Sequence, residues 1–186
     1  MLGYKFELKN VELAKLSEED LPNVARFDCG EDEINHFLKD EALEEQDGGL
    51  NVTVLLYYGE RNHRWNMFRN FIYKKHIAKL KLIGFYSICA DAILLTEEER
   101  DDIPYAVAPA LKIARLGVDK SEQGRWFGVF MIEYVKREAK RLRNELGIRF
   151  VTLDAYLNNV EYYKRFGFVI NERNKRKNII SMRARF

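Results

Sequence analysis

The stretch RLGVDKSEQGRWFG, from Arg115 to Gly128, joins two segments with different hydrophobic patterns. Upstream, Ala110 to Val118 (ALKIARLGV) is rich in apolar and β-branched residues, which favours a strand. Downstream, apolar residues recur at helical spacing from about Gly128 to Leu146. The polar residues between them, Asp119 to Arg125, predict a turn. The stretch therefore reads as strand, turn and helix N-terminus.

The predicted helix carries a single apolar stripe, made of Met131, Ile132, Val135, Ala139, Leu142 and Leu146. Gly147 follows at the position where a glycine commonly ends a helix. Ile148 to Leu153 then predicts another strand. A strand, a helix and a second strand imply a parallel pair with a right-handed crossover inside a mixed sheet. The fold class is α/β or α+β, with about six strands.

Other elements follow from the same periodicity rules. We expect strands at Phe6–Leu13, Asn51–Tyr58, Leu82–Ala90 and Ile179–Arg185, helices at Glu31–Gln46 and Val160–Arg165, a loop holding Pro104 and Pro109, and a basic turn at 173–177. The helix at Glu31–Gln46 places Ile34, Phe37, Leu38, Ala42 and Leu43 on one face.

Length and composition are those of one globular domain spanning residues 1–186, with 47% hydrophobic and 32% charged residues. The net charge of +2 is unevenly spread: residues 1–60 sum to −10 and the remainder to +12. Such a split suits an anionic partner for the later half, or else solvated faces of opposite sign. We find no signal peptide or membrane span and expect a cytoplasmic protein. The three dispersed histidines predict no metal site.

A strand, a glycine-bearing turn and a helix N-terminus together form an anion site, because unpaired N–H groups and the helix dipole favour negative charge. Here the turn reads Gln123-Gly124-Arg125-Trp126-Phe127-Gly128, and Arg125 can add a charged hydrogen bond. The pattern is neither a P-loop nor a dinucleotide-binding GxGxxG motif. An ordinary helix start explains the spacing equally well.

A second segment, DAYLNNVEYYKRFGF from Asp154 to Phe168, begins where the next parallel strand ends. Ligands of open α/β sheets collect at the carboxyl ends of strands, so a phenol here could reach such a ligand. A tyrosine, with a pKa of about 10, can protonate a leaving thiolate. Tyr162 or Tyr163 could equally be a core aromatic residue.

Taken together, RLGVDKSEQGRWFG and YYKRFGF resemble the acetyl-CoA motif and the terminal "A…N…FYxxxGF" pattern of the GNAT superfamily of N-acetyltransferases. The resemblance covers roughly Ala110 to Phe168 and implies a mixed, mostly antiparallel sheet of about six to seven strands with a central parallel pair. It also implies an enzyme that transfers an acetyl group from acetyl-CoA to a primary amine by direct attack, without a metal.

The resemblance assigns roles to particular residues. The backbone of Leu116, Gly117 and Val118 would bond the pantetheine arm, and the backbone N–H groups from Gly124 to Gly128, with Arg125, would hold the pyrophosphate. The implied cofactor-binding residues are Leu116, Gly117, Val118, Gln123, Gly124, Arg125, Trp126, Phe127, Gly128 and Asn158. Tyr163 would protonate the departing thiolate. No general base is identified.

Trp126 departs from the family pattern, which has glycine at this position. If the position requires a positive φ or a close approach to phosphate, tryptophan strains or blocks it. Trp126 could instead shield the pyrophosphate, or the chain could be an inactive module that keeps the fold.

The segment FDCGEDEINHFLKDEALEEQ, from Phe27, resembles the "FDCGNxxLNxFL" opening of acetyltransferase toxins from toxin–antitoxin pairs and of their relatives. That branch implies an aminoacyl-tRNA acceptor and an antitoxin partner as the alternative to another amine substrate.

An insertion from about Arg61 to Lys81 holds seven Lys/Arg and no acid, interleaved with aromatic residues such as Trp65 and Phe68. Basic and aromatic residues together can bind tRNA through phosphate contacts and base stacking. An amphipathic helix packed on the domain, or on a second copy in a homodimer, explains the same pattern.

Overall fold

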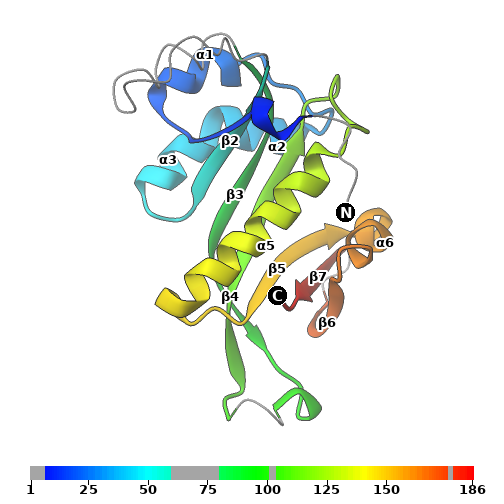
Figure 1. Ribbon diagram of the computed structural model, residues 1–186. Helices are drawn as coiled ribbons and strands as arrows, with labels where there is room; N and C mark the ends of the chain where they lie inside the picture. The colour runs from blue at the N-terminus through cyan, green and yellow to red at the C-terminus, as the bar shows by residue number, and fades with distance from the viewer. Residues whose placement is uncertain (1–6, 60–79, 101–103, 176–177) are drawn as a thin grey trace. The chain divides into compact units, whose positions relative to one another are not determined.

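The computed structural model describes residues 7–59, 80–100, 104–175 and 178–186 (Figure 1). Its strands are β1 (Val11–Lys15), β2 (Val52–Tyr58), β3 (Lys81–Leu94), β4 (Val107–Val118), β5 (Phe150–Tyr156), β6 (Val169–Lys175) and β7 (Ile179–Ala184). Its α-helices are α1 (Leu21–Val24), α2 (Asp32–His36), α3 (Ala42–Asp47), α5 (Phe127–Leu146) and α6 (Val160–Lys164).

The strands form one seven-stranded mixed sheet in the order β1-β2-β3-β4-β5-β7-β6. β4 and β5 are parallel, with Ala110 opposite Phe150 and Ile113 opposite Leu153. β1 pairs with β2, β5 with β7 and β6 with β7, all antiparallel. The predicted fold class, the sheet of six to seven strands and its parallel pair are confirmed.

The chain divides into two compact units, and the first comprises Met1–Ser87 with Arg115–Met131. Its helices α1, α2 and α3, blue to cyan in Figure 1, include the predicted helix at Glu31–Gln46, whose middle turn is a π-helix at Phe37–Glu41. The predicted apolar face is confirmed, because Phe37, Leu38 and Ala42 are buried in one hydrophobic cluster.

The second unit comprises Ile88–Ala114 with Ile132–Phe186. β5, β7 and β6 lie side by side, and α6 contacts β5 (Figure 1). A small core joins the far end of the β3–β4 pair to the start of β5 through Ile93, Leu95, Ala108, Ala110 and Phe150.

Helix α5 begins in the first unit and continues into the second. The predicted stripe is buried at Met131, Ile132, Val135 and Ala139, whereas Leu146, its last member, is 69% exposed at the last turn of the helix. Gly147 has a φ of +66°, which confirms the expected glycine at the helix end.

Three assignments differ from those expected. β1 begins at Val11, after a 3₁₀ turn at Leu8–Asn10. Pro109 lies inside β4 rather than in a loop. The first three residues of the basic run at 173–177 belong to β6 and not to a turn.

Of the predicted basic insertion, residues 61–79 lie outside the described residues, whereas Leu80 is buried and Lys81 begins β3. Among the helices of the described ranges, none combines the length and the hydropathy needed to cross a bilayer.

Candidate functional site

The carboxyl end of β4 holds Leu116, Gly117 and Val118, beyond the four positions that pair with β5. Gly117 is buried, and a Cβ atom there would lie 2.9 Å from Cε1 of Phe85 and 3.1 Å from Cγ2 of Ile34. Packing against these two side chains therefore requires glycine in the strand.

Asp119 shapes the turn that follows β4. Its backbone N–H donates to Ile83 O (2.9 Å), and its Oδ1 accepts from the backbone N–H of Ser121 (3.1 Å) and from Ser121 Oγ (2.5 Å). The N–H of Glu122 donates to Asp119 O at 2.8 Å. The predicted polar turn is thus a hydrogen-bonded turn anchored on the neighbouring strand β3.

Two residues of the loop have left-handed backbone conformations, Gly124 and Trp126, each with a φ of +74°. Trp126 O accepts the first helical hydrogen bond of α5, from the N–H of Phe130 at 2.9 Å. Trp126 is thus the residue that precedes the helix, and it is the one non-glycine residue with a positive φ in the described part of the chain. The strain suspected from the sequence is therefore present.

The N–H groups that could bind an anion lie along this loop and the first turn of α5. Within residues 7–59, 80–100, 104–175 and 178–186, no group accepts a hydrogen bond from the N–H of Gly124, Arg125, Trp126 or Gly128. A 20-residue helix starting at Phe127 adds the positive end of its dipole. These residues fit the pyrophosphate of a nucleotide cofactor.

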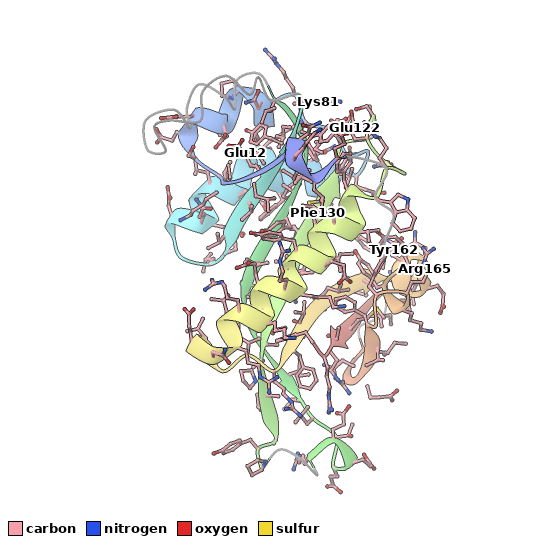
Figure 2. The ribbon with its side chains drawn as sticks, in the orientation of Figure 1. Glu12, Lys81, Glu122, Phe130, Tyr162 and Arg165 are labelled. Atoms are coloured by element: carbon pink, nitrogen blue, oxygen red, sulfur yellow. The ribbon has the colours of Figure 1, made fainter. Side chains whose placement is uncertain are left out.

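Arg125 is held inside this loop by an acidic neighbour. Its Nη1 lies 2.5 Å from Oε2 of Glu122, and its guanidinium lies 5.4 Å from the ring centroids of both Tyr58 and Phe127. Lys81 Nζ lies 3.2 Å from Oε1 of the same carboxylate, and Figure 2 shows Lys81 beside Glu122.

The basic side chains at the loop are therefore matched by as many carboxylates: Arg125 pairs with Glu122, Lys81 lies near Glu122 and, at 3.6 Å, Asp119, and Lys120 pairs with Asp28 at 2.5 Å. Because these charges are balanced, the backbone N–H groups and the helix dipole supply most of the attraction for an anion. The sequence did not predict that Lys81, at the start of β3, pairs with Glu122 in the loop. An acid inside a predicted anion loop was the available signal that a basic partner had to lie nearby.

Gln123 holds the loop through its side chain. Its Nε2 donates to Cys29 O at 2.8 Å and to Val118 O at 3.1 Å. The prediction that Gln123 contributes to cofactor binding is compatible with this geometry only through its backbone, since the side-chain amide is engaged with two carbonyls.

Asn158 and Tyr163 lie in the second unit, the first in a 3₁₀ turn at Leu157–Asn159 and the second in α6. Asn158 is exposed. The ring of Tyr163 packs edge-on against Tyr162, with centroids 5.3 Å apart, and against Phe168 at 6.0 Å. No group among the described residues forms a hydrogen bond with the Tyr163 hydroxyl.

Burial raises the pKa of Tyr163 to about 12, with the neighbouring Tyr162 adding to the shift. Tyr163 therefore keeps its proton throughout the physiological range and can act as a donor. Burial also raises the pKa of Tyr162, although Arg165, 5.1 Å from its ring centroid and beside it in Figure 2, opposes the shift.

The structure thus brings together the loop residues Leu116 to Gly128 in the first unit and places Asn158 and Tyr163 in the second. The described residues contain no group of three or more His, Cys, Asp or Glu side chains arranged to bind a metal ion.

No model of a known protein family matches the chain. Solved structures do resemble it over most of its length. A Tyr-to-Phe mutant of KacT has a TM-score of 0.72 over 92% of this chain and 94% of that one, at 22% identity.

AtaT complexed with acetyl-methionyl-tRNA has a TM-score of 0.71 over 92% of this chain and 93% of that one, at 20% identity. A Tyr-to-Phe mutant of the toxin AtaT, bound to the C-terminus of the antitoxin AtaR and to acetyl-CoA, has a TM-score of 0.69 at 17% identity, covering 94% and 93%. The chain therefore has the fold of the GNAT acetyltransferases, which KacT and AtaT share.

Proposed function

We propose that this chain is an acetyl-CoA-dependent N-acetyltransferase that acts on a primary amine by direct attack. The observation that carries the proposal is the loop from Gly124 to Gly128, where the N–H groups of Gly124, Arg125, Trp126 and Gly128 have no acceptor among the described residues and lie at the positive end of α5. The GNAT fold and the acetyl-CoA bound to AtaT support the choice of cosubstrate.

Binding of acetyl-CoA would use backbone groups of the first unit. The N–H groups of Gly124, Arg125, Trp126 and Gly128 would donate to the pyrophosphate, and the strand edge at Leu116–Val118 would pair with the pantetheine arm as an added strand does. Arg125 would share its guanidinium between Glu122 and a phosphate oxygen, since its five donors allow both contacts.

Acetyl transfer would then proceed in one displacement. The lone pair of the neutral amine attacks the thioester carbonyl carbon, the C–S bond breaks, and the sulfur leaves with the bonding electrons. An N–H group of β4 would stabilise the negative charge on the carbonyl oxygen. Tyr163 would give its proton to the sulfur, the proton of the attacking amine would pass to water, and the tyrosinate would regain a proton from water.

The raised pKa of Tyr163 suits a donor more than a base. A phenol with a pKa of about 12 stays protonated at neutral pH, whereas a general base would have to be ionised there. Its hydroxyl makes no structural hydrogen bond within the described ranges, in contrast to Tyr57, whose hydroxyl donates to Asp20 Oδ1 at 2.7 Å. Asn158 would contact the pantetheine side of the cofactor.

The second candidate acceptor is an aminoacyl-tRNA, which would make the chain a toxin with an antitoxin partner. The supporting observations are AtaT, which has this fold and was solved with acetyl-methionyl-tRNA, and the FDCG segment at Phe27–Gly30. Induced expression should then stop translation and growth, and undisturbed growth would contradict the toxin assignment.

The acceptor can be identified with radiolabelled acetyl-CoA. The purified chain is incubated with charged total tRNA, with deacylated tRNA and with a panel of amines and peptides. The proposal predicts label on the amine of one class, and the tRNA alternative predicts label on charged tRNA only. Absence of labelled product with every acceptor, together with unchanged acetyl-CoA, would contradict the enzymatic assignment.

A further inference from the structure

A polar cluster outside the loop holds the segment that follows Phe27. Asp28 Oδ1 accepts from the N–H of Gly30 at 2.8 Å and from Asn35 Nδ2 at 2.9 Å. Asn35 Oδ1 in turn accepts from the N–H of Cys29 at 2.9 Å. The single amide of Asn35, on helix α2, thus holds two consecutive residues through its donor and its acceptor. We call Asp28, Cys29 and Asn35 the clamp.

The clamp is bonded at four points to residues 119–123, which lead into the loop at Gly124–Gly128. The N–H of Lys120 donates to Asp28 O at 2.8 Å, and Lys120 Nζ lies 2.5 Å from Asp28 Oδ2. The N–H of Asp28 donates to Asp119 Oδ2 at 3.4 Å, and Gln123 Nε2 donates to Cys29 O at 2.8 Å. Residues about 90 positions apart in the chain are therefore joined immediately before Gly124.

The loop requires such support because its own conformation is strained. Trp126 adopts a left-handed conformation that an L-residue with a Cβ atom disfavours, and such a conformation persists only where its surroundings enforce it. The hydrogen bond from Lys120, with those from the Gly30 N–H and Asn35, holds the pKa of Asp28 well below its usual range. The clamp therefore stays ionised and bonded at every physiological pH.

We propose that Asn35 is a positioning residue for acetyl-CoA. Through Asp28 and Cys29 it holds residues 119–123, so that the N–H groups from Gly124 to Gly128 converge on the pyrophosphate. This inference rests on the function proposed above. It also gives the FDCG segment a physical role: Asp28 and the Cys29 backbone carry the contacts to the loop, and Gly30 closes their turn with a φ of +86°.

The role predicts a particular kinetic signature. A defect in the clamp should weaken binding of the pyrophosphate part of acetyl-CoA and leave binding of the acetyl-pantetheine part unchanged. Substrates with and without the pyrophosphate, acetyl-CoA and acetyl-pantetheine, should therefore respond differently to a defect in the clamp.

The test is Asn35→Asp, which keeps the acceptor for the Cys29 N–H but replaces the donor to Asp28 with a second carboxylate. We expect the KM for acetyl-CoA to rise roughly tenfold with kcat within about twofold of wild type, since one lost charged hydrogen bond has this order of effect. The kcat/KM for acetyl-pantetheine should not change. Asn144→Asp, an exposed Asn-to-Asp change on α5, is the matched control and should leave both substrates unaffected.

Lys120→Gln provides a milder second variant, because it removes the ion pair with Asp28 and keeps the backbone bond. It should raise the KM for acetyl-CoA by a smaller factor than Asn35→Asp does. Circular dichroism of both variants checks that they fold. An equal loss with acetyl-CoA and acetyl-pantetheine, or an unchanged KM, in folded variants would overturn the inference while the proposed function stands. A wild-type chain that binds no acetyl-CoA would overturn both.

Discussion

Trp126 is the residue at which the sequence departs from the family pattern and at which the backbone is strained. The left-handed conformation costs an L-residue about 1–2 kcal/mol relative to glycine. Trp126 nevertheless adopts this conformation, as does Gly124 two residues earlier. The tryptophan therefore leaves the backbone geometry of the anion loop in place, and its N–H group remains a donor.

Replacing Trp126 with glycine and with alanine separates strain from side-chain contacts, because both variants lose the same indole. At an ordinary helical position the glycine variant would be less stable than the alanine variant by about 1 kcal/mol. At this left-handed position we expect Trp126→Gly to be more stable than Trp126→Ala by about 1 kcal/mol. The free energies of unfolding in urea give the difference, and an alanine variant as stable as the glycine variant would contradict the strain.

The proposed role of Tyr163 as proton donor can be tested by comparing it with its neighbour Tyr162. Tyr163→Phe should lower kcat roughly 10²–10⁴-fold with an unchanged dissociation constant for acetyl-CoA, since it removes only the proton donor. Tyr162→Phe changes the same functional group in the same aromatic cluster and should leave kcat within about threefold. Equal kcat values for the two variants would reject the assignment of Tyr163.

The pH dependence follows from the raised pKa of Tyr163. A proton donor loses activity as the pH rises through its pKa, so the loss due to Tyr163 should be centred near pH 12 and not near 10, the ordinary tyrosine value. The kcat/KM of the wild type should therefore not fall between pH 8 and about 10.5. A decline centred near pH 10 that Tyr163→Phe abolishes would contradict the shift.

Strand β4 leads into the loop proposed to bind acetyl-CoA, and Gly117 is its most tightly packed residue. A methyl group there would approach Phe85 Cε1 to 2.9 Å, and Phe85 is wholly buried. We expect Gly117→Ala to cost about 1–3 kcal/mol of stability, the usual effect of overpacking, and to weaken acetyl-CoA binding.

Gly48→Ala is the matched control for Gly117→Ala. Gly48 has a φ of −72°, and the nearest atom to a Cβ there would lie 3.4 Å away, so alanine fits without rearrangement. Its thermal midpoint should equal or exceed that of the wild type. Similar losses in both variants would show that the effect at Gly117 is not steric.

Elements with strong periodicity could be predicted from the sequence, and others could not. The stripe of α5 and the apolar face at Ile34–Leu43 identify their helices because each buries one face against a core. β6 escaped prediction because NERNK lacks strand propensity. Pairing with β7, including a register shift between Ile170 and Lys175, makes it a strand.

For the whole molecule, the motifs RLGVDKSEQGRWFG and YYKRFGF predicted the fold and the loop at Gly124–Gly128. They did not predict the contacts that hold this loop in place. Lys81 lies 41 residues from Glu122, and Asp28 lies 92 residues from Lys120, and no local sequence pattern reports such pairings. Tyr163 was distinguished from Tyr162 by resemblance alone. Among the described residues no group bonds the Tyr163 hydroxyl, and burial raises the pKa of both tyrosines, so the geometry does not exclude Tyr162.

Calorimetric titration of the intact chain with acetyl-CoA tests the central claim most directly, because every proposed role depends on the cosubstrate binding to the loop. One acetyl-CoA should bind saturably to each chain, with a matching rise in Tm. No heat and no thermal shift at millimolar acetyl-CoA would contradict it, and would leave a GNAT fold without the chemistry of its relatives.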